Sequence, residues 1–178
     1  YMHAGGNNAA TFAYTNGEWI SITNRIDLDA DLAQVYFGTT LIHEWQYSLQ
    51  AQGQPGAKQL GGANFYAGAT AGMTPKYYID DVVYESVSEL AIYFGDFDSY
   101  PAGGYVAQTI PEFFTTWSNT PGTAEDAQFS TDFALSAPNS VKIAGTTDLI
   151  FKLGNKTSGK YLVAFDYLVP VGKGGYFN

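Results

Sequence analysis

The chain has 178 residues, a formal net charge of −9 and no cysteine. This acidic balance argues against nucleic acid and anionic membrane surfaces as partners, because both are bound through basic patches. Without cysteine the chain forms no disulfide and offers no thiolate to a metal. No run of apolar residues reaches the roughly 18 that a membrane-spanning helix needs, so we expect no membrane span.

The first elements predicted along the chain are a strand and a long helix. Residues 18–23 alternate between apolar and polar side chains, which predicts a short strand. Apolar residues within 32–49 recur near the helical period, which would place them on one side of a helix. This helix is expected to begin after Asp29 or Asp31 and to end near Gln52.

The next stretch of sequence predicts a loop, two more helices and a domain boundary. Residues 53–72 are rich in glycine and predict a loop. Helices are expected over 75–94 and over 105–117. Residues 118–127 are polar and contain a Pro-Gly turn, so they are expected to separate a domain at 1–117 from a module at 118–178.

The second module shows the period of two that is typical of strands. The alternating apolar residues are Val141 and Ile143, then Leu149, Phe151 and Leu153, then Tyr161, Val163, Phe165, Tyr167 and Val169. Turn residues separate the three sets, so we expect an antiparallel meander. The fold class expected for the whole chain is α+β: a helical domain with a short N-terminal strand region, followed by an antiparallel β-sandwich segment.

The first predicted helix carries the motif with the most specific chemistry. Residues 41–50 read LIHEWQYSLQ. In zinc peptidases, H-E-x-x-H on a helix brings two imidazoles to one metal, and the glutamate serves as general base. His43 is therefore predicted as a zinc ligand and Glu44 as the catalytic base. Tyr47 stands where the second histidine belongs, and either its phenolate or His3 from the N-terminal segment would complete the site.

The second predicted helix supplies matching acids. Residues 84–89 read YESVSE, which resembles the downstream motif of the gluzincin group of zinc peptidases. The resemblance implies that Glu85 is the third zinc ligand and that Glu89 orients the His43 ring through a hydrogen bond. In the alternative interpretation, His43 is a buried helix residue bonded to Glu85 or Glu89, and no metal is involved.

The second module carries a resemblance of its own. Residues 117–127 read WSNTPGTAEDA and residues 153–161 read LGNKTSGKY. Both are similar to concanavalin-A-like and laminin-G-like sandwich modules of type IX-secreted bacterial proteins. The resemblance implies a secreted or cell-surface protein, a cell-surface glycan as ligand, and a structural Ca²⁺ near Glu125 and Asp126. It also implies a longer module, so the segment is expected to be an incomplete sandwich whose open face another chain covers.

Two functions follow from these patterns. The first is a secreted zinc metallopeptidase-like protein that hydrolyses peptide bonds of extracellular proteins. Because Tyr47 replaces a histidine ligand, the sequence leaves open whether the chain is an enzyme. The alternative is an inactive pseudopeptidase that serves as an adhesion, carbohydrate-binding or structural component of a bacterial surface assembly.

Overall fold

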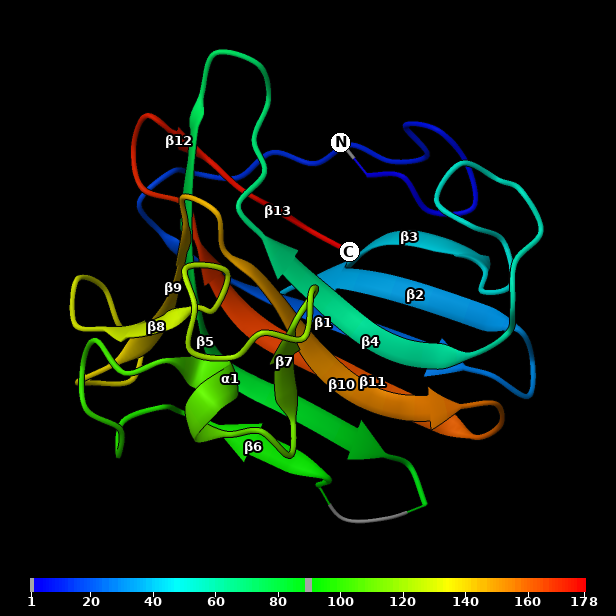
Figure 1. The fold of residues 1–178 in the computed structure, drawn as a ribbon. Coiled ribbons are helices and arrows are strands. Elements are labelled where there is room, and N and C mark those ends of the chain that lie inside the picture. Colours follow the sequence, from blue (N-terminus) through cyan, green and yellow to red (C-terminus); the bar gives the residue numbers. More distant parts are fainter. Residues whose placement is uncertain (1, 89–90) are drawn as a thin grey trace.

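The regular secondary structure of the protein is almost entirely β-strand (Figure 1). The computed structural model describes residues 2–88 and 91–178. The strands are β1 (Trp19–Asp27), β2 (Leu32–Phe37), β3 (Thr40–Gln46), β4 (Leu60–Tyr66), β5 (Thr74–Ser86), β6 (Tyr93–Gly95), β7 (Phe114–Thr116), β8 (Gln128–Ser130), β9 (Ser140–Ala144), β10 (Asp148–Lys156), β11 (Lys160–Leu168), β12 (Lys173–Gly174) and β13 (Tyr176–Phe177). The one helix in the described ranges is α1 (Val106–Thr109), a single turn. The expected α+β class is therefore wrong, and the fold is all-β.

The strands form two sheets that face each other across the core, and all of their pairs are antiparallel except the short β12–β5 pair. The larger, nine-stranded sheet has the order β3-β2-β1-β11-β5-β9-β8, and β6 and β12 also pair with β5. The smaller, four-stranded sheet has the order β13-β4-β10-β7. Inward-facing side chains of both sheets fill the space between them, as in a β-sandwich.

The long helix predicted after Asp29 is a β-hairpin instead. Strands β2 and β3 pair antiparallel, with Phe37 opposite Thr40. Gly38 has a φ of 53°, which lies in the left-handed region that glycine adopts at little cost, and this allows the tight turn. Ala33 and Val35 are buried on either side of Gln34, so the strand period explains the same residues as the helical one.

The two later helices are also wrong as predicted. Residues expected over 75–94 instead form β5 and β6, and the inward side of β5 carries Tyr77, Ile79, Val82 and Tyr84. Of the helix expected over 105–117, α1 alone is helical, and β7 follows it. The glycine-rich loop over 53–72 contains β4.

The strands predicted in the second module are confirmed, but their arrangement is not a meander. The alternating sets around Val141, Phe151 and Phe165 are buried on strands β9, β10 and β11. Strand β9 lies in the larger sheet, β10 in the smaller sheet and β11 in the larger sheet again. Strand β11 pairs with β1 and β5, while β10 pairs with β4 and β7. Strands from both sides of residues 118–127 therefore share the same two sheets.

The two sheets do not cover each other evenly. At one end, under β10 and β7, aromatic side chains fill the core, and Phe114 stacks on Phe151 with ring centroids 5.0 Å apart. At the other end, the smaller sheet stops at β4 and β13. There the inward faces of β1, β2 and β3 border a cavity, and residues Ile22, Val35 and Trp45 line it.

Candidate binding cavity

The residues predicted to hold zinc lie on strands. His43 and Glu44 are on β3, which is the edge strand of the larger sheet. The His43 ring has Nε2 3.1 Å from the backbone oxygen of Ala4, and it stacks on the Trp45 ring at 5.7 Å between centroids. Glu44 is exposed, and its Oε2 accepts a hydrogen bond of 2.6 Å from Gln34 Nε2. Because neighbours along a strand point to opposite faces, His43 and Glu44 do not converge.

The other predicted ligands lie elsewhere. Glu85 is an exposed residue of β5, and three strands separate β5 from β3. Four steps between neighbouring strands amount to about 19 Å, because adjacent strands lie about 4.8 Å apart. The Tyr47 hydroxyl donates to the backbone oxygen of Gln59 at 3.0 Å. Burial raises the pKa of Tyr47, whereas a phenolate ligand would require a lowered pKa.

These placements do not fit a zinc ion. Residues 2–88 and 91–178 contain no group of three His, Cys, Asp or Glu side chains that could hold a metal. His3 Nδ1 accepts a hydrogen bond from the Asn8 backbone, and Glu89 lies outside the described residues. The gluzincin interpretation is wrong because it needs two packed helices, and the corresponding sequences form β3 and β5. The zinc roles assigned to His43, Glu44, Tyr47 and Glu85 lose their basis with it.

The acids expected near a structural calcium ion serve as hydrogen-bond acceptors for the backbone. Asp126 is buried, and its carboxylate accepts from the backbone N–H groups of Ala107, Gln108 and Gly122 at 2.9 to 3.1 Å. Glu125 accepts from the Ser118 backbone at 2.9 Å. These bonds tie α1 and the turns after β7 together, and they give both acids a structural role.

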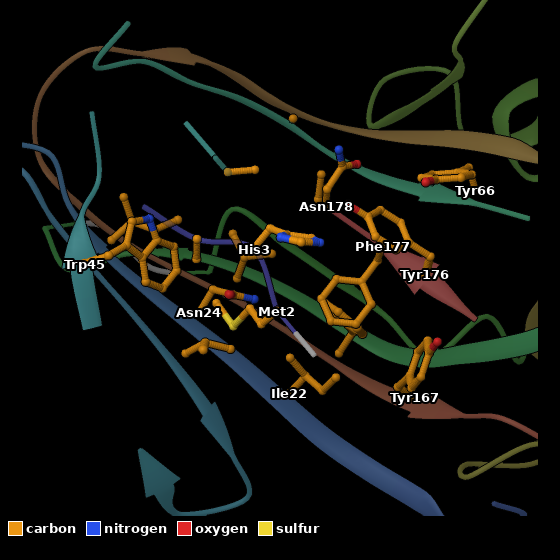
Figure 2. Close-up of a pocket in the computed structure, with 18 of the residues that line it drawn as sticks. Met2, His3, Ile22, Asn24, Trp45, Tyr66, Tyr167, Tyr176, Phe177 and Asn178 are labelled. Atoms are coloured by element: carbon orange, nitrogen blue, oxygen red, sulfur yellow. The ribbon is translucent and has the colours of Figure 1, made fainter. Parts of the chain in front are cut away.

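A large cavity lies between the two sheets. It has a volume of about 870 Å³, within the range of small-molecule sites. Its floor is the inward face of β1, β2, β3 and β11, and its opposite wall is β4 with β13. The N-terminal segment lines it with Met2, His3 and Phe12. Figure 2 shows Met2, His3, Ile22, Asn24, Trp45 and Phe177 around the same space.

The cavity is uncharged although the chain is not. The protein has 8 basic and 17 acidic residues, yet none of the described residues lining the cavity is Asp, Glu, Lys or Arg. Aromatic rings from several elements dominate the lining: Phe37, Trp45, Tyr66, Phe165, Tyr167 and Tyr176. Such a lining favours a neutral ligand, because a charged ligand would lose its hydration without gaining a partner.

One polar side chain interrupts the apolar floor. Asn24 lies on β1 between Ile22 and Ile26, and it points into the cavity (Figure 2). No hydrogen bond joins its side-chain amide to any residue that the structure describes. An amide offers two donors and an acceptor, so Asn24 can hold a neutral polar group of a ligand. The sequence signal for Asn24 is that it is the one polar residue in the alternating series Ile20, Ile22, Asn24, Ile26, whose members all line the cavity.

Tyrosines hold the wall that β13 forms. The Tyr77 hydroxyl donates to the backbone oxygen of Tyr176 at 2.7 Å and to that of Tyr66 at 3.2 Å. The Tyr66 and Tyr176 rings lie 4.7 Å apart between centroids. Burial raises the pKa values of Tyr77 and Tyr167, so both phenols remain neutral near pH 7. The tyrosines add hydroxyl groups to the site but no charge.

Comparison with protein families finds none that matches the chain, and comparison with curated proteins finds no relative. No helix in the described residues is long and apolar enough to cross a membrane. The cavity is therefore the feature of the molecule that bears on its function.

Proposed function

We propose that the chain is a non-enzymatic binding module that holds a neutral ligand in the cavity between its sheets, in an adhesion or structural role outside the cell. The observation that carries this proposal is the cavity lining, which combines aromatic rings with the free amide of Asn24 and contains no charged residue. Ligand sites are typically apolar and aromatic with a few polar groups that orient the ligand.

The volume of the cavity also supports a binding role. Globular interiors are close-packed, so a space of about 870 Å³ inside a sandwich is far larger than a packing defect. The rings of Trp45 and Tyr176 are half-buried, which leaves part of each ring available for contact. Aromatic side chains provide large contact areas at low conformational cost, and this is why binding surfaces favour them.

The test is equilibrium binding to panels of neutral oligosaccharides and capped neutral peptides, each with a charged counterpart. The wild-type chain is expected to bind a neutral ligand with little change in affinity between about 0.05 and 0.5 M salt, because screening acts on charges. Asn24→Leu is expected to lower that affinity by about tenfold, the usual worth of a hydrogen bond. Tyr176→Ala is expected to lower it as well.

The matched control is Phe94→Ala. Phe94 lies on β6, is 60% exposed and does not line the cavity, so its loss should leave the affinity unchanged. Binding only to charged ligands, with a steep dependence on salt, would contradict the proposal. So would neutral binding that Phe94→Ala abolishes and that Asn24→Leu and Tyr176→Ala leave intact.

A further inference from the structure

One asparagine stands alone on the apolar floor of the cavity. Asn24 lies on β1, and its register partners on the neighbouring strands are Val163 of β11 and Val35 of β2. Its neighbours on the same face of β1 are Ile22 and Ile26, which are 1% and 8% exposed. These four side chains have no polar atom, so none of them can bond the amide. Asn24 itself is half-buried, and its side chain points into the cavity (Figure 2).

Both ends of the Asn24 amide are therefore available to a ligand. No hydrogen bond joins its Oδ1 or Nδ2 to any residue that the structure describes. Tyr161, two residues along β11 from Val163, already donates its hydroxyl to the backbone oxygen of Ser158 at 3.0 Å. Asparagine is unfavourable in strands, and an unpaired amide on an apolar face costs free energy. A ligand group that supplies both a donor and an acceptor removes that cost.

The amide of Asn24 selects a particular kind of polar group. Its oxygen accepts and its nitrogen donates along one edge, so a group with a donor and an acceptor side by side meets both atoms at once. Primary carboxamides and lactams present such an edge. Asparagine pairs in this two-point manner with the donor–acceptor edge of adenine, and the pairing discriminates adenine from the other bases. A trans secondary amide points its N–H and C=O in opposite directions, so it reaches only one of the two atoms.

The rest of the lining selects the body of the ligand. The rings of Phe37, Trp45, Phe165 and Phe177 line the cavity, and none of the described lining residues is Asp, Glu, Lys or Arg. Aromatic rings of this kind pack against flat or branched apolar groups. A saccharide fits the floor less well, because each of its hydroxyl groups would lose water and the aliphatic side chains around Asn24 offer no partner. A charged group is disfavoured for the same reason.

We infer that the cavity is selective for a carboxamide: an apolar or aromatic body that carries one primary amide or lactam group, which pairs with Asn24 through two hydrogen bonds. The ligand N–H donates to Oδ1 of Asn24, and the ligand C=O accepts from Nδ2. This inference rests on the proposed function and names the chemical class of its ligand. A free small amide and a glutamine side chain of a peptide offer the same chemistry, and the test has an arm for each source.

The first measurement compares matched ligands on the wild-type chain by isothermal titration calorimetry. Naphthamide is the small amide, and its twin is the methyl ketone in which CH₃ replaces NH₂. Naphthamide is expected to bind about tenfold more tightly, because the ketone leaves Oδ1 of Asn24 without a donor. The peptide arm compares a capped tripeptide that has glutamine between two phenylalanines with its methionine twin. A preference within one pair alone assigns that source, and equal affinities within both pairs would overturn the inference.

The second measurement exchanges the specificity at about pH 8, well above the ordinary pKa of an aspartate. Asn24→Asp replaces the donor with a second acceptor, so it should bind naphthamide about tenfold more weakly. It should gain the cationic isostere naphthamidine, whose two N–H groups match a carboxylate. Asn24→Leu should bind the amide and the ketone equally, and the control Phe94→Ala should keep the wild-type preference. If Asn24→Asp still prefers naphthamide to naphthamidine, the ligand amide does not pair with this residue and the inference is wrong.

A spectroscopic readout keeps the test decisive if a substitution at Asn24 prevents folding. The side-chain NH₂ group of Asn24 gives its own pair of nitrogen-correlated proton signals in a nuclear magnetic resonance spectrum of the wild-type chain. Saturation with naphthamide should shift these signals, because the group gains a hydrogen-bond acceptor. Saturation that leaves them unmoved would overturn the inference, because the ligand would then bind away from Asn24.

The two proposals fail differently. If neutral ligands bind in the cavity and neither the amide nor the glutamine peptide is preferred over its twin, the neutral binding site stands and carboxamide selectivity is wrong. If no amide, ketone, peptide or oligosaccharide binds, both are wrong.

Discussion

The two ends of the space between the sheets differ although they share the larger sheet. At the filled end, under β10 and β7, Phe151 is fully buried and touches Tyr84, Tyr93 and Phe114 with centroid distances of 5.0 to 6.1 Å. At the open end, Trp45 and Tyr176 are only half-buried and face the cavity. The larger sheet presents apolar side chains at both ends, so the extent of the smaller sheet determines where the core is close-packed and where a cavity remains.

The largest expected effect tests the filled end. Phe151→Ala should lower the free energy of unfolding by about 3–5 kcal/mol, because it removes a buried ring and leaves a void among rings that cannot close it. Denaturant unfolding checks this value. A loss below about 1 kcal/mol would mean that the filled end is not packed as described.

The next prediction concerns a buried carboxyl group of the larger sheet. Asp80 on β5 accepts backbone hydrogen bonds from Asp81 and Leu135 at 2.9 and 2.8 Å. Burial raises the pKa of Asp80 to about 7, against the lowering effect of these bonds. In the unfolded chain the group ionises near pH 4. The folded state therefore holds a proton between about pH 4 and 7 that the unfolded state has lost, and the stability that Asp80 contributes falls as the pH rises.

Asp80→Asn removes this titration. The difference in unfolding free energy between wild type and Asp80→Asn should shift against the wild type by roughly 1.4 kcal/mol per pH unit between about pH 4 and 7. Denaturant unfolding at several pH values measures the slope. A difference that stays constant with pH would show that Asp80 is ionised in the folded protein.

A matched truncation at the open end should have a smaller effect on stability. Trp45→Ala is expected to lower the free energy of unfolding by no more than about 2 kcal/mol, because the ring is half-buried and faces the cavity. Binding of the neutral ligand should weaken at the same time. A loss of stability as large as that of Phe151→Ala would remove the distinction between the two ends.

The smallest expected effect comes from filling the cavity. Ala63 lies on β4, packs against the core and lines the cavity. Ala63→Leu should raise the free energy of unfolding by about 0.5–1 kcal/mol and should weaken ligand binding, because the added carbons occupy the cavity. Thermal unfolding together with the binding assay checks both effects. A gain in stability without a loss of binding would place the ligand elsewhere.

Part of the fold could be predicted because the apolar residues of some segments follow the strand period and not the helical one. Leu149, Phe151 and Leu153 recur at every second position between turns, so their strand was predicted and is confirmed. The segment that contains Val35 and His43 is different, because its apolar residues satisfy the helical period and the strand period equally. Gly38 favours the hairpin over the helix, because it adopts the left-handed backbone of the turn at little cost and would destabilise a helix that contained it.

The candidate site was missed because it belongs to no single segment. The His43-Glu44 pair predicted a zinc site, but the two residues lie on β3, where successive side chains point to opposite faces. Asn24 is a single amide among the isoleucines of β1, and this weak signal becomes meaningful only when the opposite wall of the cavity is known.

The sequence by itself determined the alternation of the C-terminal strands, the acidic balance of the chain and the absence of thiol chemistry. Only the tertiary structure decided which sheet each strand joins, where the smaller sheet ends and that a neutral cavity lies beneath its edge. The physical reason is that a strand's side-chain pattern specifies which face is buried, while its pairing edges are backbone groups that every sequence shares.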